Sequence, residues 1–75
     1  MKALVEYLAR ALARHPDQVV VEEERFGDRI VLRLTVADED KGRIIGREGR
    51  IANAIRSLLY VAATRAGVRA TLDIE

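Results

Sequence analysis

The chain has 75 residues, of which 49% are hydrophobic and 33% charged, and a formal net charge of +1, which suits one small folded domain spanning residues 1–75. This composition excludes a disordered tail, and the absence of cysteine excludes a disulfide scaffold and a cysteine zinc site. The single histidine excludes a histidine metal cluster, and no apolar run is long enough for membrane insertion, so we expect a cytoplasmic protein.

The first predicted element is a helix over residues 2–14. Leu4, Leu8 and Leu12 recur every four residues and predict the buried stripe of this helix. His15 and the proline after it end the helix, because proline cannot continue the hydrogen-bond ladder. We interpret the histidine as a helix C-terminal residue favoured by the helix dipole, not as a metal ligand.

Two strands joined by a tight turn are predicted next, over residues 19–26 and 30–36. Apolar and polar residues alternate along the second strand, as expected where one face of a sheet is buried. The Gly-Asp pair between the strands fits a two-residue hairpin turn. The register that this turn sets places Val21 opposite Leu34 on the core side.

The open face of this hairpin carries charge. The same register places Glu22 opposite Arg33, an opposite-charge pair across the two strands. Glu22 begins a run of three glutamates, which we interpret as protection of an edge strand in preference to an acidic binding patch.

Two helices of unequal length follow. The acidic segment 38–40 predicts a helix start by capping, in preference to a metal site, and this short helix is interrupted at Gly42 and ends at Gly46. A longer helix is predicted over residues 50–66, with a buried arc centred on Ile55. The other expected members of that arc are Ile51, Ala54, Leu58, Leu59, Ala62 and Ala66.

The last predicted element is a strand over residues 69–75, with Ala70, Leu72 and Ile74 on one face. The order of elements is therefore α-β-β-α-α-β. The predicted fold class is α+β, a two-layer sandwich of a three-stranded sheet with the helices on one face.

The segment between the two later helices is the candidate functional site. Residues 41–56 hold five basic residues against one acid, whereas residues 1–37 hold six of each. Gly46 and Gly49 bracket two polar residues directly before a helix N-terminus, where unpaired N–H groups and the helix dipole favour a phosphate. A lone Gly-x-x-Gly is common, but the arginines around it favour a nucleic-acid contact.

The sequence GRIIGREGR, followed by ANAIRSLL, closely resembles the KhpA (YlqC-type) family of small bacterial K-homology (KH) proteins. The resemblance covers essentially the whole chain. It implies a type II KH fold whose GxxG loop clamps the backbone of single-stranded RNA. It also implies an RNA chaperone or post-transcriptional regulator linked to cell-envelope growth and cell shape. Its partners would be a second copy of the chain, in a homodimer, or a Jag/KhpB-type KH protein.

Carried over to this chain, the resemblance implies an RNA site at the loop and its flanks. Its residues are Lys41, Arg43, Ile45, Gly46, Arg47, Glu48, Gly49, Arg50 and Asn53. Glu48 departs from the basic or neutral residues common in such loops, and its charge opposes phosphate. It has three alternative partners, Arg47, Arg50 and Lys41, or else it points to solvent. No residue identifies a 2′-hydroxyl contact, so the choice between RNA and single-stranded DNA stays open.

Self-association is expected on the long helix. A tyrosine on its exposed face beside small residues suits a close contact between helices, and the resemblance favours a symmetric dimer there. The predicted dimer contact consists of Arg56, Leu59, Tyr60 and Ala63.

Two other functional classes are alternatives to RNA binding. An enzyme is disfavoured, because the chain has no cysteine, one histidine and one serine; we expect no catalytic residue, metal, cofactor or small-molecule substrate. The main alternative is a protein-interaction module with vestigial RNA binding that acts through a KH partner. The near-zero net charge and Glu48 favour that alternative, and the arginine cluster opposes it.

Overall fold

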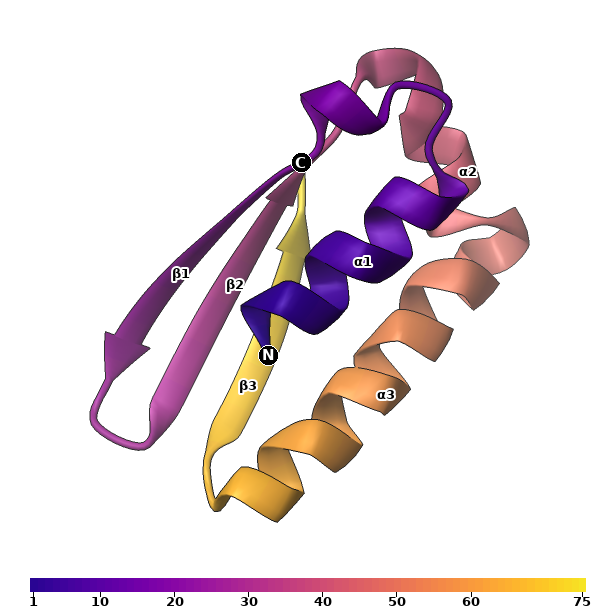
Figure 1. Ribbon diagram of the computed structural model, residues 1–75. Coiled ribbons are helices and arrows are strands. Elements are labelled where there is room, and N and C mark those ends of the chain that lie inside the picture. The colour runs from indigo at the N-terminus through magenta and orange to yellow at the C-terminus, as the bar shows by residue number, and fades with distance from the viewer.

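The helices lie on one face of a three-stranded sheet in the computed structural model, which describes residues 1–75 (Figure 1). The regular elements are α1 (Lys2–Leu12), β1 (Val20–Phe26), β2 (Arg29–Thr35), α2 (Lys41–Ile45), α3 (Arg50–Ala66) and β3 (Arg69–Ile74). Short 3₁₀ turns occupy Pro16–Gln18, Asp38–Asp40 and Arg47–Gly49. The predicted α+β fold class and element order are confirmed. None of the helices combines the length and the apolar character needed to cross a membrane.

The sheet has the strand order β1-β2-β3. The predicted hairpin register is confirmed: Val21 is paired with Leu34, and Gly27 in the turn has a φ of +62°. β3 runs parallel to β2, which it reaches by the crossover through α2 and α3. β3 is therefore an edge strand, and α3 lies alongside it (Figure 1).

The charged pairs of the hairpin differ slightly from the prediction. Glu22 is opposite Arg33 in the register, as expected. The guanidinium of Arg33, however, forms its ion pair with Glu24. The reason is geometric, because residues two apart on β1 lie on the same face and both are within reach of a long side chain.

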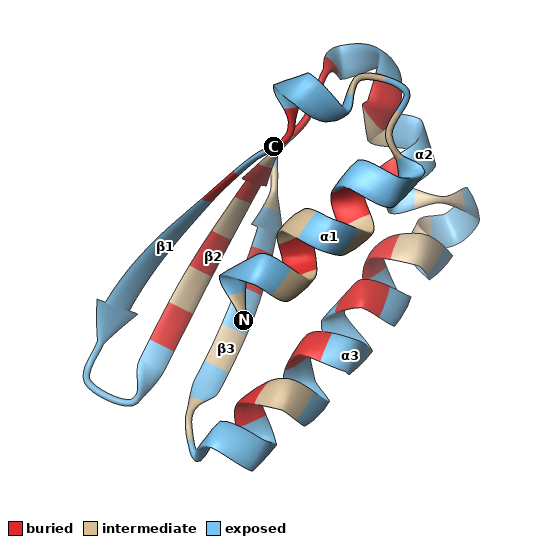
Figure 2. Cartoon of the chain, in the orientation of Figure 1, coloured by how far each residue is buried: buried red, intermediate tan, exposed pale blue.

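The core lies between the sheet and the helices (Figure 2). Its largest fully buried side chains are Val5, Leu32, Leu34, Ile44 and Leu59, together with the polar Asp40. In α1 the buried residues are Val5 and Ala9, while Leu12 of the predicted stripe is 37% exposed at the end of the helix.

The buried arc of α3 is rotated from its predicted position. Ile55 and Leu59 are buried as expected, but Ala52 and Ala63 complete the arc, whereas Leu58 is 51% exposed. The rotation follows from the place of α3 over the edge strand β3, where small alanines let the helix approach the sheet.

The acidic segment 38–40 does not cap a helix with its side chains, and Gly42 lies inside α2 without interrupting it. Asp40 is instead fully buried, and its two carboxylate oxygens accept the backbone N–H groups of Arg14 and His15 at 3.0 and 2.9 Å. Those N–H groups follow the end of α1 and have no helical partner. Asp40 thus ties the end of α1 to the start of α2.

Candidate nucleic-acid interface

The loop between α2 and α3 has backbone dihedral angles that most residues other than glycine avoid. Gly46 and Gly49 both have a φ of +76°, and Glu48 between them has a φ of +57°. The N–H of Gly49 donates to the carbonyl oxygen of Gly46 at 3.2 Å and closes the turn. Three left-handed residues in a span of four make a tight loop that ends directly at Arg50, the first residue of α3.

The two glycines are under different steric constraints. A Cβ on Gly46 would lie 2.9 Å from both the Cβ and the backbone nitrogen of Ile51, so this position has no room for a side chain. A Cβ on Gly49 would find only the Asn53 amide nitrogen, at 3.8 Å. The approach to the second glycine and to the start of α3 is therefore open.

The N-terminus of α3 offers backbone donors to a ligand. Gly49 precedes the helix, and no side chain caps the first turn. The N–H groups of Gly49 and Arg50 donate to the carbonyl oxygens of Gly46 and Arg47, so the donors open to a ligand are those that follow Arg50 in this turn. The first N–H groups of a helix have no intrahelical partner, and the helix dipole adds a positive partial charge there. The arrangement is suited to a phosphate group.

The basic side chains around this point are exposed. Arg43 and Arg47 form no ion pair within the chain, whereas Arg50 lies 3.6 Å from Glu48. Of the alternative partners that the sequence left open for Glu48, the structure shows an ion pair with Arg50. Lys41 is paired with Asp38 at 3.2 Å, so it contributes less free charge than the sequence suggested.

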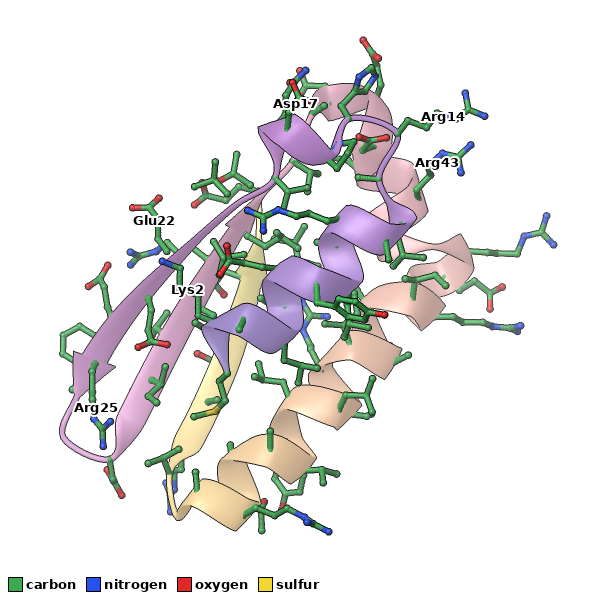
Figure 3. The ribbon with its side chains drawn as sticks, in the orientation of Figure 1. Lys2, Arg14, Asp17, Glu22, Arg25 and Arg43 are labelled. Atoms are coloured by element: carbon green, nitrogen blue, oxygen red, sulfur yellow. The ribbon has the colours of Figure 1, made fainter.

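A further arginine belongs to this side of the molecule. Figure 3 shows Arg14, from the segment after α1, extending in the same direction as Arg43 from α2. Both flank Asp40. Its carboxylate accepts a hydrogen bond from the backbone N–H of Arg14, and the charge of the nearby Arg43 helps to lower its pKa. This neighbourhood was not predictable from sequence, because Arg14 and Arg43 are 29 residues apart and meet only through tertiary contacts such as those of Asp40.

The pKa of Asp40 lies below its ordinary value. Burial alone raises the pKa of this carboxyl, but the hydrogen bonds from the N–H groups of Arg14 and His15, with the nearby charges of His15 and Arg43, outweigh that effect. Asp40 is therefore ionised and holds the end of α1 against the start of α2.

A groove runs from the loop along α3 and the free edge of β3. A cavity of about 710 Å³ is lined by Asn53, Arg56, Ser57, Leu59, Tyr60 and Val61 of α3 and by Ala70, Thr71 and Leu72 of β3. A second hollow of about 500 Å³ shares Tyr60 and Ala70 with the first and continues to the end of α3. The β3 wall was not predictable from local sequence patterns, because it depends on the parallel pairing of β3 with β2.

The other predicted RNA-site residues lie around the start of this groove. Ile45 is 40% exposed at the end of α2, directly before the loop. Asn53 is exposed, lines the groove and lies next to Gly49, so it connects the loop to the cavity.

Two of the residues predicted for a dimer contact are misplaced. Leu59 and Ala63 are 1% and 2% exposed and belong to the core, so they present no surface to a second chain. Ala63 is buried because the arc of α3 is rotated, whereas Leu59 was also expected in the buried arc. Arg56 and Tyr60 are exposed, as predicted, but both line the α3–β3 groove.

The fold and the loop together define a type II KH domain. A family model described as "KhpA/KhpB, KH domain" matches residues 2–74, and the chain belongs to this family. It is 47% identical to the RNA-binding protein KhpA of Halalkalibacterium halodurans over 99% of this chain and 97% of that one. It is 43% identical to the protein of the same name from Clostridium acetobutylicum, over 99% of both chains. Membership of this family confirms that the chain is not an enzyme.

Solved structures show the same fold. A crystal structure of Era, in complex with MgGDPNP and a segment of 16S ribosomal RNA, superposes with a TM-score of 0.59 at 20% identity. The match covers 97% of this chain and 28% of the Era chain. At this level of identity the likeness concerns the fold alone.

Proposed function

We propose that the protein binds single-stranded RNA, as a single domain, with the loop at residues 46–49 on the backbone and the α3–β3 groove on the bases. The observation that carries this proposal is the uncapped N-terminus of α3 beside the unpaired Arg43 and Arg47. The names of its close relatives, which are RNA-binding proteins, support the same conclusion.

The phosphates are held by two kinds of donor in this proposal. N–H groups of the first turn of α3 beyond Arg50 bind one phosphate directly, because the glycine loop leaves the approach open. Arg43 and Arg47 pair with neighbouring phosphates as exposed, unpartnered guanidinium groups. The ion pair with Arg50 draws the carboxylate of Glu48 away from the phosphate and reduces its repulsion.

The bases occupy the groove between α3 and β3. Its walls combine apolar surface from Val61 and Ala70 with one aromatic ring, that of Tyr60, which is 69% exposed. Unstacked RNA bases bind to such surfaces by stacking and by hydrogen bonds to their edges. Tyr60 is ten residues beyond Arg50, which is about 15 Å along a helix, so the groove is long enough for several nucleotides.

The test of this proposal replaces both residues between the loop glycines, as Arg47→Asp with Glu48→Asp. Two carboxylates then face the phosphate site, while the glycine backbone and the contact with Ile51 are kept. Fluorescence anisotropy with a single-stranded RNA oligonucleotide should show at least a tenfold loss of affinity. The matched control, Arg25→Asp with Glu23→Asp on the exposed part of β1, makes the same charge change away from the loop and should bind as wild type.

Equal affinity in the loop variant and the control would contradict the proposal. It would favour the alternative of a protein-interaction module with vestigial RNA binding. The same oligonucleotide made as DNA settles the choice between RNA and single-stranded DNA.

We also propose that the chain forms a homodimer through α3, at residues other than those first expected. Leu58 is 51% exposed and lines no part of the groove, so it offers an apolar surface that a second copy would cover. Sedimentation of Leu58→Asp and Tyr60→Asp distinguishes a dimer contact at Leu58 from the contact first predicted at Tyr60. We expect Leu58→Asp to be monomeric and Tyr60→Asp to remain dimeric; the reverse result would restore the contact at Tyr60.

The remaining expectations rest on the family resemblance alone. They are a heterodimer with a Jag/KhpB-type KH protein, a role as an RNA chaperone or post-transcriptional regulator linked to cell-envelope growth, and a location in the cytoplasm. They stay predictions, and RNA as the ligand is consistent with each of them.

A further inference from the structure

The side chain of Arg56 is held in one position in the α3–β3 groove. Its Nε and Nη2 donate to the carbonyl oxygen of Leu72 at 3.4 and 3.3 Å, and its Nη1 donates to Oδ1 of Asn53 at 3.3 Å. Both partners line the same cavity. These contacts are long, but together they place the guanidinium between α3 and β3, which reduces the entropy that it loses when it binds a ligand.

The partner of Arg56 is a backbone acceptor on an unpaired strand edge. The N–H groups of Arg69 and Glu75 donate toward β2, to the carbonyl oxygens of Asp28 and Leu34. Because successive residues of a strand face opposite sides, Leu72 directs its carbonyl away from β2 and into the groove. Arg56 covers the carbonyl oxygen of Leu72. A ligand in the groove therefore meets the guanidinium of Arg56 there and not the carbonyl oxygen.

The remaining donors of Arg56 define what this point of the groove can bind. A guanidinium has five N–H donors and no acceptor. Three of the five are used, which leaves one N–H on Nη1 and one on Nη2. With the Nη1 hydrogen on the Cδ side donated to Asn53, the two free N–H groups are neighbouring donors on the terminal nitrogens, an arrangement that suits two adjacent acceptor atoms.

We propose that Arg56 selects, in the bound strand, a base that offers two adjacent hydrogen-bond acceptors. Guanine does so with O6 and N7, the pair that arginine most often contacts in nucleic acids. Cytosine does so with N3 and O2. Adenine and uracil do not, because each of their acceptors is flanked by an amino or imino donor or stands alone. The selection rests on the proposed RNA binding and adds a base preference to it.

The experiment measures affinity by fluorescence anisotropy for short oligouridines in which one internal position, each in turn, carries guanine, cytosine or adenine. We expect wild type to bind the guanine or the cytosine series about tenfold more tightly than the adenine series at one position. An oligonucleotide with 7-deazaguanine, which lacks the N7 acceptor, tests a preference for guanine. If Arg56 contacts O6 and N7, this base should bind no more tightly than adenine. A preference for cytosine is not affected by this change.

The variant that tests the residue is Arg56→Lys, which keeps the charge and loses the paired donors. The ratio of affinities between the preferred base and adenine should fall to near one. Asn53→Ala, which removes only the acceptor for Nη1, should lower the ratio without abolishing it. The matched control is Arg10→Lys on α1, which lines no part of this groove and should keep the wild-type ratio.

Circular dichroism confirms that each variant is folded before its ratio is interpreted. Absence of any preference in wild type, or an unchanged ratio in Arg56→Lys, would overturn the role of Arg56 and leave RNA binding intact. Failure of wild type to bind any of these oligonucleotides would overturn the proposed function itself, so the two failures are distinguishable.

Discussion

At the scale of single residues, the two glycines of the loop are required for different reasons. Gly46 combines a φ of +76° and a ψ of 173° with contact against Ile51, so both its backbone and its surroundings exclude a side chain. Gly49 has a φ of +76° and a ψ of 12°, a left-handed conformation that other residues adopt at modest cost, and its surroundings are open.

Alanine substitutions should separate these two roles. We expect Gly46→Ala to lower the free energy of unfolding by roughly 3 kcal/mol or more, because backbone strain and a steric clash add up. Gly49→Ala should cost about 1 kcal/mol. Urea denaturation of the two variants measures the difference, and equal costs would show that the contact between Gly46 and Ile51 is not as close as described.

Asp40 gives the protein a pH dependence whose direction follows from its lowered pKa. A carboxyl whose pKa is lower in the folded state stabilises the fold fully above its unfolded pKa, about 4, and loses this contribution as the pH falls through the folded value. The difference in unfolding free energy between wild type and Asp40→Asn should therefore be positive at neutral pH and shrink below about pH 4. Asp17→Asn, at an exposed aspartate, is the control. A gap that stays constant or widens in acid would contradict the assignment.

At the scale of elements, the sequence predicted what depends on local pattern. The bounds of α3 and the hairpin register were predictable, because they follow from helix-ending glycines, a two-residue turn and alternating side chains. The parallel pairing of β3, the groove beside it and the burial of Asp40 were not, because each joins segments far apart in the chain. The rotation of α3 was not predictable for the same reason. Periodicity shows that a helix has an apolar face, but Leu58 and Leu59 are both apolar, so the pattern does not show which of them is buried.

The neighbouring leucines of α3 test this rotation directly. Leu59→Ala should lower the free energy of unfolding by about 2–5 kcal/mol, because it leaves a cavity in the core. Leu58→Ala should cost less than about 1 kcal/mol, since its side chain is half exposed. Thermal or urea unfolding at low protein concentration, where self-association does not contribute, makes the comparison. Equal costs would place the buried arc where the sequence alone had put it.

At the scale of the whole molecule, the distribution of charge matters more than its sum. The net charge is +1, yet unpaired arginines gather where the glycine loop and the uncapped α3 helix meet. Most of the acids outside this region are engaged elsewhere or lie on the hairpin, as the pairs of Glu6 with Arg10 and Glu24 with Arg33 show. A protein of this kind attracts a polyanion only locally and only while salt does not screen the loop.

The salt dependence of RNA binding tests the central claim most directly. If Arg43 and Arg47 each neutralise one phosphate, the logarithm of the association constant should fall with the logarithm of salt concentration with a slope of about −1.4. Arg47→Ala should make the slope shallower by about 0.7. Anisotropy titrations of both proteins with one single-stranded RNA, over a series of salt concentrations, give the two slopes. Binding that is independent of salt, or a slope that Arg47→Ala leaves unchanged, would contradict phosphate recognition at this loop.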